Sequence, residues 1–261
     1  MDTHNHAPSV EAAQNLNHLY GDLGDQEQDF RNGNLIRLVE SYVQGKDVLD
    51  IGCGSGRLLT RLMQDGFAPQ GIEPDPELRK LAARMTPDLK ILAGGGERVG
   101  EFRDAFDTIT IIDVLEHIED DNQQLELMFQ ALQPGGRLVV VVPAHGWLYG
   151  KRDQNVGHYR RYSRKMLLDR VRAAGFEIES SRFWNMLGVA PYWFSERILK
   201  QELNTSLRTG QPKGFFKRTV AGLLRVWFRQ VENRFSFGFG LSVICLAVKP
   251  LPAANAQAEA A

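Results

Sequence analysis

The segment VLDIGCGSG, residues 48–56, constrains the fold of this chain more than any other stretch. An apolar run ends in Asp50, and glycines at 52, 54 and 56 lead into RLLTRLM, whose apolar residues have helical spacing. Glycine is needed where a backbone turns with positive φ or approaches a ligand closely, and a helix start presents free N–H groups. The segment predicts a buried strand, a Gly-rich loop that holds a ligand, and a helix. A tight turn without a ligand is the alternative.

Short β-branched runs alternate with helical segments along the chain, which is the pattern of a parallel α/β sheet. We expect strands at 47–51, 68–72, 89–93, 107–112, 137–143, 176–183 and 241–248. The segments 76–85 and 122–133 have apolar residues at helical spacing and suit crossover helices. A further helix is expected from Ser163, which is its N-cap, to about Ala174, because Gly175 follows as a stop signal.

Residues 184–240 do not follow this alternation. They contain three of the four Trp, and the stretch from Arg197 to Arg234 has nine Lys or Arg against two acids, although the net charge of the chain is −1. An amphipathic helix with a basic polar face is expected there. Its apolar stripe consists of Val220, Leu223, Leu224, Trp227 and Val231. Three interpretations stay open: a lid packed on the main domain, a contact with an anionic membrane through 213–234, or a partner-binding surface.

The expected organisation is a core of residues 15–183 and 241–249, a helical cap of 184–240, and disordered tails at 1–14 and 250–261. The start of the chain lacks the pattern of a signal peptide, and no run of roughly 18 apolar residues occurs, so a cytoplasmic protein is expected. Cys53 and Cys245 fit no disulfide or metal-ligand spacing, which predicts two buried free thiols and no metal site.

Three more segments come after the Gly-rich loop in order: GIEPD (71–75), FDTITIIDVLEHI (106–118) and LQPGGRL (132–138). Together with 48–56 they resemble the class I S-adenosylmethionine-dependent methyltransferases, over about residues 46–182. The resemblance implies an α/β fold of the doubly wound, Rossmann-like kind, with a mostly parallel seven-stranded sheet and an antiparallel last strand. It also implies S-adenosyl-L-methionine as cofactor. The G-x-G-x-G spacing differs from the dinucleotide fingerprint, which makes a nicotinamide-dependent oxidoreductase the weaker alternative.

The resemblance assigns cofactor contacts by position. Glu73 would hold the ribose, and it lies after the second strand, where an acid can accept hydrogen bonds from both ribose hydroxyls. The other positions are Asp50, Gly52, Cys53, Gly54 and Gly56 around the methionine part, Gly95, Gly96 and Glu97 beside the adenine, and Asp113 and Val114 at the end of strand four. Many relatives carry an acid in a Gly-Asp or Asp-Ala pair beside the adenine, whereas GGGERV here offers only Glu97.

Methyl transfer from a sulfonium is an in-line displacement, so the protein chiefly positions and desolvates the reactants. A hydroxyl acceptor benefits from a base whose pKa lies near the working pH, which favours His. The candidates are His117, His145 and His158, which all lie beyond the carboxyl ends of predicted strands, where open α/β sheets bind ligands. A structural role at a helix start or in a solvated loop is the alternative for each.

The segment after strand four indicates the class of acceptor. Relatives that methylate base amino groups carry an Asn/Asp-Pro-Pro-aromatic motif there, whereas this chain has IDVLEH, so a nucleic-acid acceptor is not expected. An LEH-like triplet is common in the small-molecule branch, including O-methyltransferases of quinone biosynthesis. We therefore expect methyl transfer to oxygen of a small or lipid-linked acceptor. A cofactor-binding module that acts through partners is the alternative, and no oligomeric state is predicted.

The segment GHYRRYS, residues 157–163, combines a His, two Tyr and an Arg pair before the Ser163 helix. It either forms a wall of the acceptor site or is a helix entrance whose Arg pair anchors the lid. The side chains expected on the acceptor side are Trp147, Tyr149, Arg160, Arg161 and Tyr162.

Overall fold

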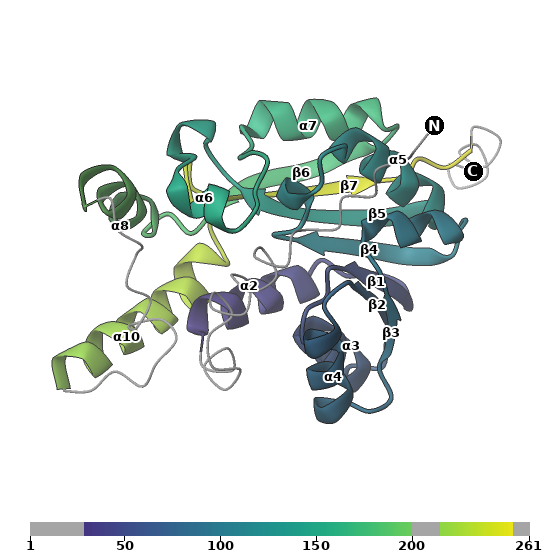
Figure 1. Cartoon of the computed structure of the whole chain (residues 1–261), viewed down its shortest axis with the longest axis horizontal. Helices are drawn as coiled ribbons and strands as arrows, with labels where there is room; N and C mark the ends of the chain where they lie inside the picture. Colours follow the sequence, from purple (N-terminus) through teal and green to yellow (C-terminus); the bar gives the residue numbers. More distant parts are fainter. Residues whose placement is uncertain (1–28, 200–214, 253–261) are drawn as a thin grey trace, which may run out of the picture.

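A computed structural model describes residues 29–199 and 215–252 of the chain. The predicted tail 1–14, most of the tail 250–261 and the part of the cap from 200 to 214 lie outside the described residues. All seven predicted strands are present (Figure 1). They are β1 (Asp47–Ile51), β2 (Ala68–Glu73), β3 (Lys90–Ala93), β4 (Phe106–Ile112), β5 (Leu132–Pro143), β6 (Glu177–Trp184) and β7 (Ser242–Val248).

The strands form one sheet in the order β3-β2-β1-β4-β5-β7-β6. The pairs among β1 to β5 are parallel, whereas β7 is inserted antiparallel between β5 and β6. The doubly wound sheet with an antiparallel last strand is therefore confirmed. The order reverses between β1 and β4, and open sheets of this kind bind ligands in the crevice beyond the carboxyl ends at such a point.

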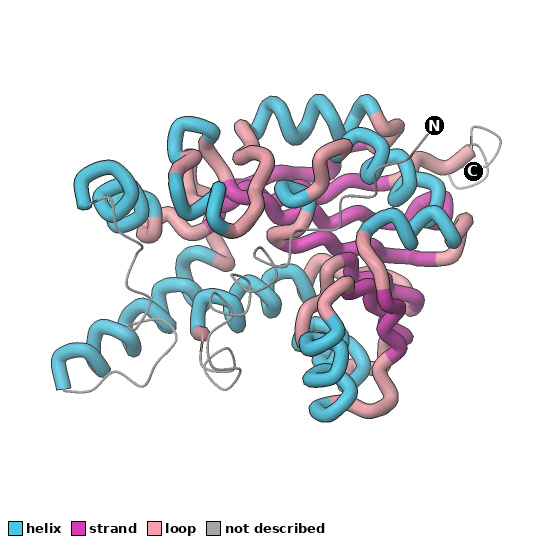
Figure 2. The backbone as a smooth tube through the Cα atoms, viewed as in Figure 1, coloured by secondary structure: helices cyan, strands magenta, loops and turns pink. Residues whose placement is uncertain are grey.

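Helices cover both faces of the sheet, as Figure 2 shows. The longer ones are α2 (Phe30–Glu40), α3 (Arg57–Gln64), α4 (Pro76–Met85), α5 (Asp121–Ala131), α7 (Arg164–Ala173) and α10 (Phe215–Trp227). Short helical pieces are α6 (Lys151–Asn155), α8 (Val189–Trp193), the 3₁₀ turns η2 (Gly96–Glu101), η3 (Leu115–His117) and η4 (Gly146–Leu148), and the π turns η5 (Phe194–Leu199) and η6 (Phe228–Glu232).

Two apolar clusters hold these layers together. The first joins β1 through Leu49 to α5 and α7, whose Leu125 and Leu167 are fully buried. The second joins β1 through the adjacent Val48 to Leu38 of α2 on the opposite face. Successive strand residues point to opposite faces, so a strand that is apolar throughout can stabilise both layers.

The predicted helix after Ser163 is confirmed as α7. The Ser163 hydroxyl accepts a hydrogen bond from the Met166 N–H at 3.1 Å, which satisfies one of the free donors of the first turn. Gly175 lies just beyond the helix with φ +102°, a conformation that favours glycine.

The second half of the predicted cap belongs to the main domain. Trp184 ends β6 and is fully buried beside Phe228 of η6, with ring centroids 5.1 Å apart. The carboxylate of Glu232, also fully buried, accepts hydrogen bonds from the Asn185 and Met186 N–H groups at 3.0 and 2.7 Å. Phe228 and Glu232 therefore pack against the main domain, whereas Arg229 and Gln230 between them are exposed.

Leu223, a member of the apolar stripe expected in this helix, is 66% exposed. Ala221, Phe228 and Glu232 are buried, and Leu224, Trp227 and Val231 are half-buried beside them. Among residues 29–199 and 215–252, no helix is both long and apolar enough to cross a membrane.

Candidate active site

The Gly-rich loop lies at the reversal point of the sheet. Gly52, Gly54 and Gly56 all have positive φ, at +68°, +57° and +74°. A Cβ on Gly52 would lie 2.3 Å from Val114, so the loop packs directly on the segment after β4. A Cβ on Gly54 would meet no described atom within 4 Å. The loop thus leaves open space beside Gly54, where a ligand can approach the backbone.

Two buried carboxylates face this loop. Glu73 is 4% exposed, and its two oxygens accept hydrogen bonds from the N–H groups of Gly54 and Asp75 at 2.8 and 2.9 Å. Asp50 is also 4% exposed and accepts a hydrogen bond from the Thr110 hydroxyl at 2.6 Å. Burial, with a smaller contribution from the charge of Glu73, raises the pKa of Asp50 to about 7.

These carboxylates fit the predicted cofactor. S-adenosylmethionine carries a sulfonium and an ammonium group, and a cation placed between Asp50 and Glu73 would relieve their mutual repulsion. Each oxygen of Glu73 has a lone pair left after its backbone hydrogen bond, so it can still accept a ribose hydroxyl. The residues present therefore suit the cofactor, while their individual roles stay predictions.

The remaining cofactor candidates surround the same edge. Cys53 is buried, and burial raises the pKa of its thiol; like the buried Cys245 it is free, as predicted. The carboxylate of Glu97 is exposed and accepts a hydrogen bond from the Gly95 N–H at 2.9 Å. The carbonyl of Gly96 accepts a hydrogen bond from the Gln124 side chain at 3.1 Å. Glu97 is thus positioned by its own loop.

Asp113 lies directly after β4 with φ +51°, an uncommon conformation for a residue other than glycine. The Arg31 guanidinium of α2 lies 3.8 Å from its carboxylate and reaches Ser242 at 3.5 Å. Arg31 also lies over the Trp184 ring, 5.4 Å from its centroid. Arg31 was not predicted, because nothing in the local pattern of residues 30–40 links it to this edge.

The structure brings two of the three candidate histidines together. The rings of His117 and His158 are nearly perpendicular, with centroids 4.5 Å apart. Glu116, 1% exposed, lies beside them, and its Oε1 is 3.8 Å from Nε2 of His158. Within the described part of the chain, neither oxygen of Glu116 has a hydrogen-bond partner. Burial, followed by the charge of Asp113, raises the pKa of Glu116, and burial lowers the pKa of His117 to about 4.

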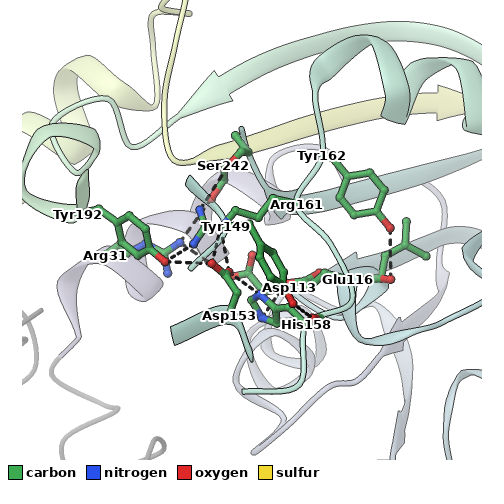
Figure 3. Close-up of polar contacts among 12 residues, drawn as sticks. Arg31, Asp113, Glu116, Tyr149, Asp153, His158, Arg161, Tyr162, Tyr192 and Ser242 are labelled. Atoms are coloured by element: carbon green, nitrogen blue, oxygen red, sulfur yellow. Dashed lines mark hydrogen bonds and ion pairs between the residues drawn. The ribbon is translucent and has the colours of Figure 1, made fainter. Parts of the chain in front are cut away.

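Asp153 of α6 orients His158. It lies 2.8 Å from Nδ1 of His158 and also pairs with Nε of Arg161 at 2.8 Å (Figure 3). Although burial raises the pKa of Asp153, the hydrogen bonds from His158 and Arg161 outweigh it and lower the pKa to about 2. A hydrogen bond from Nδ1 to an ionised Asp153 leaves Nε2 directed at Glu116.

The other side of Arg161 contacts the cap. Its guanidinium donates to the Tyr192 hydroxyl at 2.5 Å and lies over that ring, 4.5 Å from the centroid. Arg161 is only 8% exposed, and Asp153 and Tyr192 both engage its guanidinium group. This arrangement fits the alternative of an Arg that anchors the lid, and a place for Arg161 on the acceptor side stays a prediction.

Arg160 and Tyr162 belong to a second buried network. Arg160 lies 2.9 Å from Asp121, and the Tyr162 hydroxyl donates to the same carboxylate at 2.6 Å. Tyr162 is fully buried in the core, and nothing in its surroundings supports the predicted contact with the acceptor. A polar ring tip buried with a satisfied hydrogen bond is a structural arrangement.

His145 is separated from the other two histidines. It has φ +65° and stacks on Phe183 of β6 with an interplanar angle of 10° and centroids 5.2 Å apart. Its neighbour on the other side is Trp147, at 5.5 Å. His145 is therefore part of the β6 side of the molecule.

Trp147 lines an apolar groove of about 520 Å³ at the surface of the cap. The other lining side chains are Met186, Leu187, Val189, Ala190, Trp193 and Phe239. The Tyr149 hydroxyl donates to the His158 carbonyl at 2.7 Å. Since Tyr192 of α8 bonds to Arg161, the helix that lines the groove is tied to the network that holds His158.

Glu116, Asp153 and Tyr192, like Arg31, are members of this site that the sequence did not predict. The sequence contained a signal that Glu116 belongs to the site, since it lies beside His117 just after a predicted strand. It contained no such signal for Asp153 or Tyr192, because their partner Arg161 lies 8 residues from Asp153 and 31 residues from Tyr192.

Comparison with known proteins agrees with this architecture. Residues 26–181 match the family described as methyltransferase domain. A ubiquinone biosynthesis O-methyltransferase of Paracidovorax citrulli is 30% identical over 131 residues, covering 46% of this chain and 55% of that protein. The likeness thus spans about half the length of this curated relative.

Solved structures share the fold. One, described as a possible histamine N-methyltransferase of Thermotoga maritima, has a TM-score of 0.59 and 18% identity, over 91% of this chain and 96% of that one. A methyltransferase of Archaeoglobus fulgidus has a TM-score of 0.54 and 16% identity, over 83% and 92%. With the sheet order, the Gly-rich loop and the two buried acids, the match over 26–181 shows that this chain belongs to the class I S-adenosylmethionine-dependent methyltransferases.

Proposed function

We propose that this chain transfers the methyl group of S-adenosylmethionine to an oxygen atom of a small acceptor that carries an apolar, lipid-like part. The observation that carries the proposal is the connection between two sites. The Glu116, His117 and His158 cluster lies at the cofactor edge of the sheet, and the apolar groove is lined by α8, whose Tyr192 bonds to Arg161 in the network that holds His158.

Each part has a chemical role in this proposal. The bound cofactor supplies an electrophilic methyl group. Asp50 and Glu73 bind its charged and ribose portions, and Gly54 allows close approach. The cluster around His158 receives the acceptor's hydroxyl group, and the groove removes the apolar part of the acceptor from water. Burial of apolar surface contributes roughly 25 cal/mol per Å², so the groove adds affinity without touching the reacting atoms.

Oxygen is favoured over nitrogen by two observations. The curated relative from Paracidovorax citrulli is an O-methyltransferase by name. The cluster also offers the imidazole of His158, oriented by Asp153, as a base at the cofactor edge. A hydroxyl acceptor needs a base more than an amine does, because a hydroxyl must lose its proton to become a strong nucleophile.

The test measures release of S-adenosylhomocysteine with paired acceptors, each a hydroxylated ring with and without a prenyl tail. The tailed acceptor should have a KM at least about tenfold lower, since several buried methylenes contribute about 0.8 kcal/mol each. Trp193→Gln should remove this preference while kcat for the untailed acceptor is unchanged. Lys165→Gln, an exposed substitution on α7, is the control. Cofactor binding without turnover on any acceptor would instead favour a non-catalytic binding module.

We further propose that the protein binds the inner face of a membrane and transfers the methyl group there. Leu223 and Val226 of α10 are 66% and 59% exposed and lie beside the exposed Arg225 and Arg229. Such a surface suits anionic lipid. Removal of 213–234 would delete the core residue Phe228, so the better variant is Leu223→Asp with Val226→Asp. Sedimentation with anionic vesicles should fall in this variant, and unchanged sedimentation would contradict the membrane contact.

A further inference from the structure

We propose that Glu116, His117 and His158 bind a divalent metal ion at the cofactor edge of the sheet. Each of the three side chains offers one ligand atom, and these atoms lie within 4.8 Å of one another. Ligands of a tetrahedral zinc ion lie about 2.0–2.2 Å from the metal, and hence about 3.4 Å apart. The distance from Glu116 Oε1 to His158 Nε2 is already 3.8 Å, so small side-chain rotations suffice to close the cluster around an ion.

The carboxylate of Glu116 is the observation that calls for a cation. It is buried, and in the described chain neither of its oxygens has a hydrogen-bond partner. A buried carboxylate without a partner is costly, and native proteins usually pair such a group or use it to coordinate a metal. Asp113 adds negative charge near it, while the charge of Asp153 is offset by its ion pair with Arg161. A metal ion would satisfy the oxygens of Glu116 directly.

Both imidazoles are already held in orientations that suit ligands. Asp153 accepts a hydrogen bond from Nδ1 of His158 at 2.8 Å, which leaves Nε2 free to coordinate. A carboxylate behind a histidine in this way is the usual support of a metal-bound imidazole. His117 has a backbone hydrogen bond with Gly157 through its ring, and the two rings meet nearly at right angles.

The ligand set indicates the kind of ion. Two imidazole nitrogens and one carboxylate oxygen suit Zn²⁺, Fe²⁺ or Mn²⁺ better than Ca²⁺, which prefers six to eight oxygens. Three protein ligands leave at least one position open for an exogenous oxygen.

This inference rests on the proposed function where it concerns chemistry. An acceptor hydroxyl in the open position would release its proton to water more readily, because a bound cation stabilises the alkoxide or phenoxide. The oxygen then forms a bond to the methyl carbon as the bond from that carbon to sulfur breaks. The sulfur retains the electron pair, and neutral S-adenosylhomocysteine leaves.

The experiment measures metal binding directly, without cofactor or acceptor. Protein treated with EDTA and dialysed is titrated with Zn²⁺ and with Mn²⁺ in a calorimeter, and its Tm is recorded. We expect one ion per chain and a rise in Tm. Glu116→Gln keeps the side-chain shape and should weaken binding by at least about tenfold, as should His117→Asn. Folding of each variant is checked by circular dichroism.

His145→Asn is the matched control, because it removes a histidine of the same sheet edge outside the cluster and Asn tolerates its positive φ. It should bind the ion like the parent. The proposal is overturned if the parent binds neither ion, or if folded Glu116→Gln and His117→Asn bind as tightly as the parent. Ion binding without methyl transfer would refute only the proposed function, whereas equal turnover of the metal-free and metal-loaded protein would refute the chemical role of the ion.

Discussion

The two halves of the sheet satisfy their buried charges in different ways. In the half formed by β1 to β4, Glu73 is held by the backbone N–H groups of Gly54 and Asp75. In the half formed by β5 to β7 and the cap, Asp153 is held by the side chains of His158 and Arg161. Backbone donors are fixed by the strand and loop themselves, whereas side-chain partners depend on how distant segments pack.

The surfaces of the two halves differ as well. Among the described residues, nine of the twelve exposed large hydrophobic side chains are Trp147 or lie between 187 and 239. Figure 1 shows that α8 and α10 lie far from α3 and α4. Concentrated exposed apolar surface marks an interaction site. The first half is thus built for a polar, charged cofactor, and the second for contact with an apolar molecule or surface.

The largest expected effect tests the side-chain network of the second half. Asp153→Asn leaves the guanidinium of Arg161 buried without a countercharge, and loss of one partner of a buried pair costs about 3 kcal/mol. Urea unfolding should report this loss. Lys165→Ala, which breaks the exposed pair with Asp169, should change stability by less than about 0.5 kcal/mol. Similar values for both variants would contradict the proposed importance of the network.

The corresponding change in the first half is Glu73→Ala. It removes the carboxylate that is predicted to accept hydrogen bonds from the ribose hydroxyls. The Kd for S-adenosylhomocysteine should therefore rise roughly 30-fold, equivalent to about 2 kcal/mol. Calorimetric titration measures this. Asp153→Asn, titrated as folded protein in the absence of denaturant, should bind the cofactor nearly as well as the parent. An unchanged Kd for Glu73→Ala would contradict the ribose assignment.

Asp50 should make both the stability and the cofactor affinity of the first half depend on pH. Its pKa is raised to about 7 in the folded chain, so the native state binds this proton more tightly than the unfolded state. The contribution of Asp50 to the free energy of unfolding therefore falls as pH rises from about 4 to about 7. A cationic cofactor favours the ionised form, so S-adenosylmethionine affinity should rise about tenfold from about pH 6 to about pH 8. In Asp50→Asn this rise should be absent, and its persistence would assign the effect to another group.

The smallest expected effect concerns a local feature of the second half. Ser163→Ala removes the N-cap of α7 and should lower stability by about 1 kcal/mol, measured by thermal unfolding. Ser163→Asp, which also caps a helix, should retain most of that stability. Equal losses in the two variants would show that Ser163 acts through something other than the cap.

Local features of this protein were predictable from the sequence. The seven strands, the helix after Ser163 and the Gly-rich loop arise from apolar periodicity, caps and turns that involve neighbouring residues. The pairing of His117 with His158 was predictable only in outline, since both were expected at the same edge. The burial of Tyr162 was missed, because its partner Asp121 lies 41 residues earlier in the chain.

The sequence by itself determined the sheet, the cofactor loop and the family, because each depends on backbone conformations that particular residues impose locally. Only the tertiary structure decided that Arg161 bonds to Tyr192 of α8, that Phe228 and Glu232 are buried, and that Glu116 lies buried beside two histidines with no hydrogen-bond partner among the described residues. The physical reason is that burial and side-chain pairing depend on which distant segments meet, and apolar periodicity carries no information about the partner.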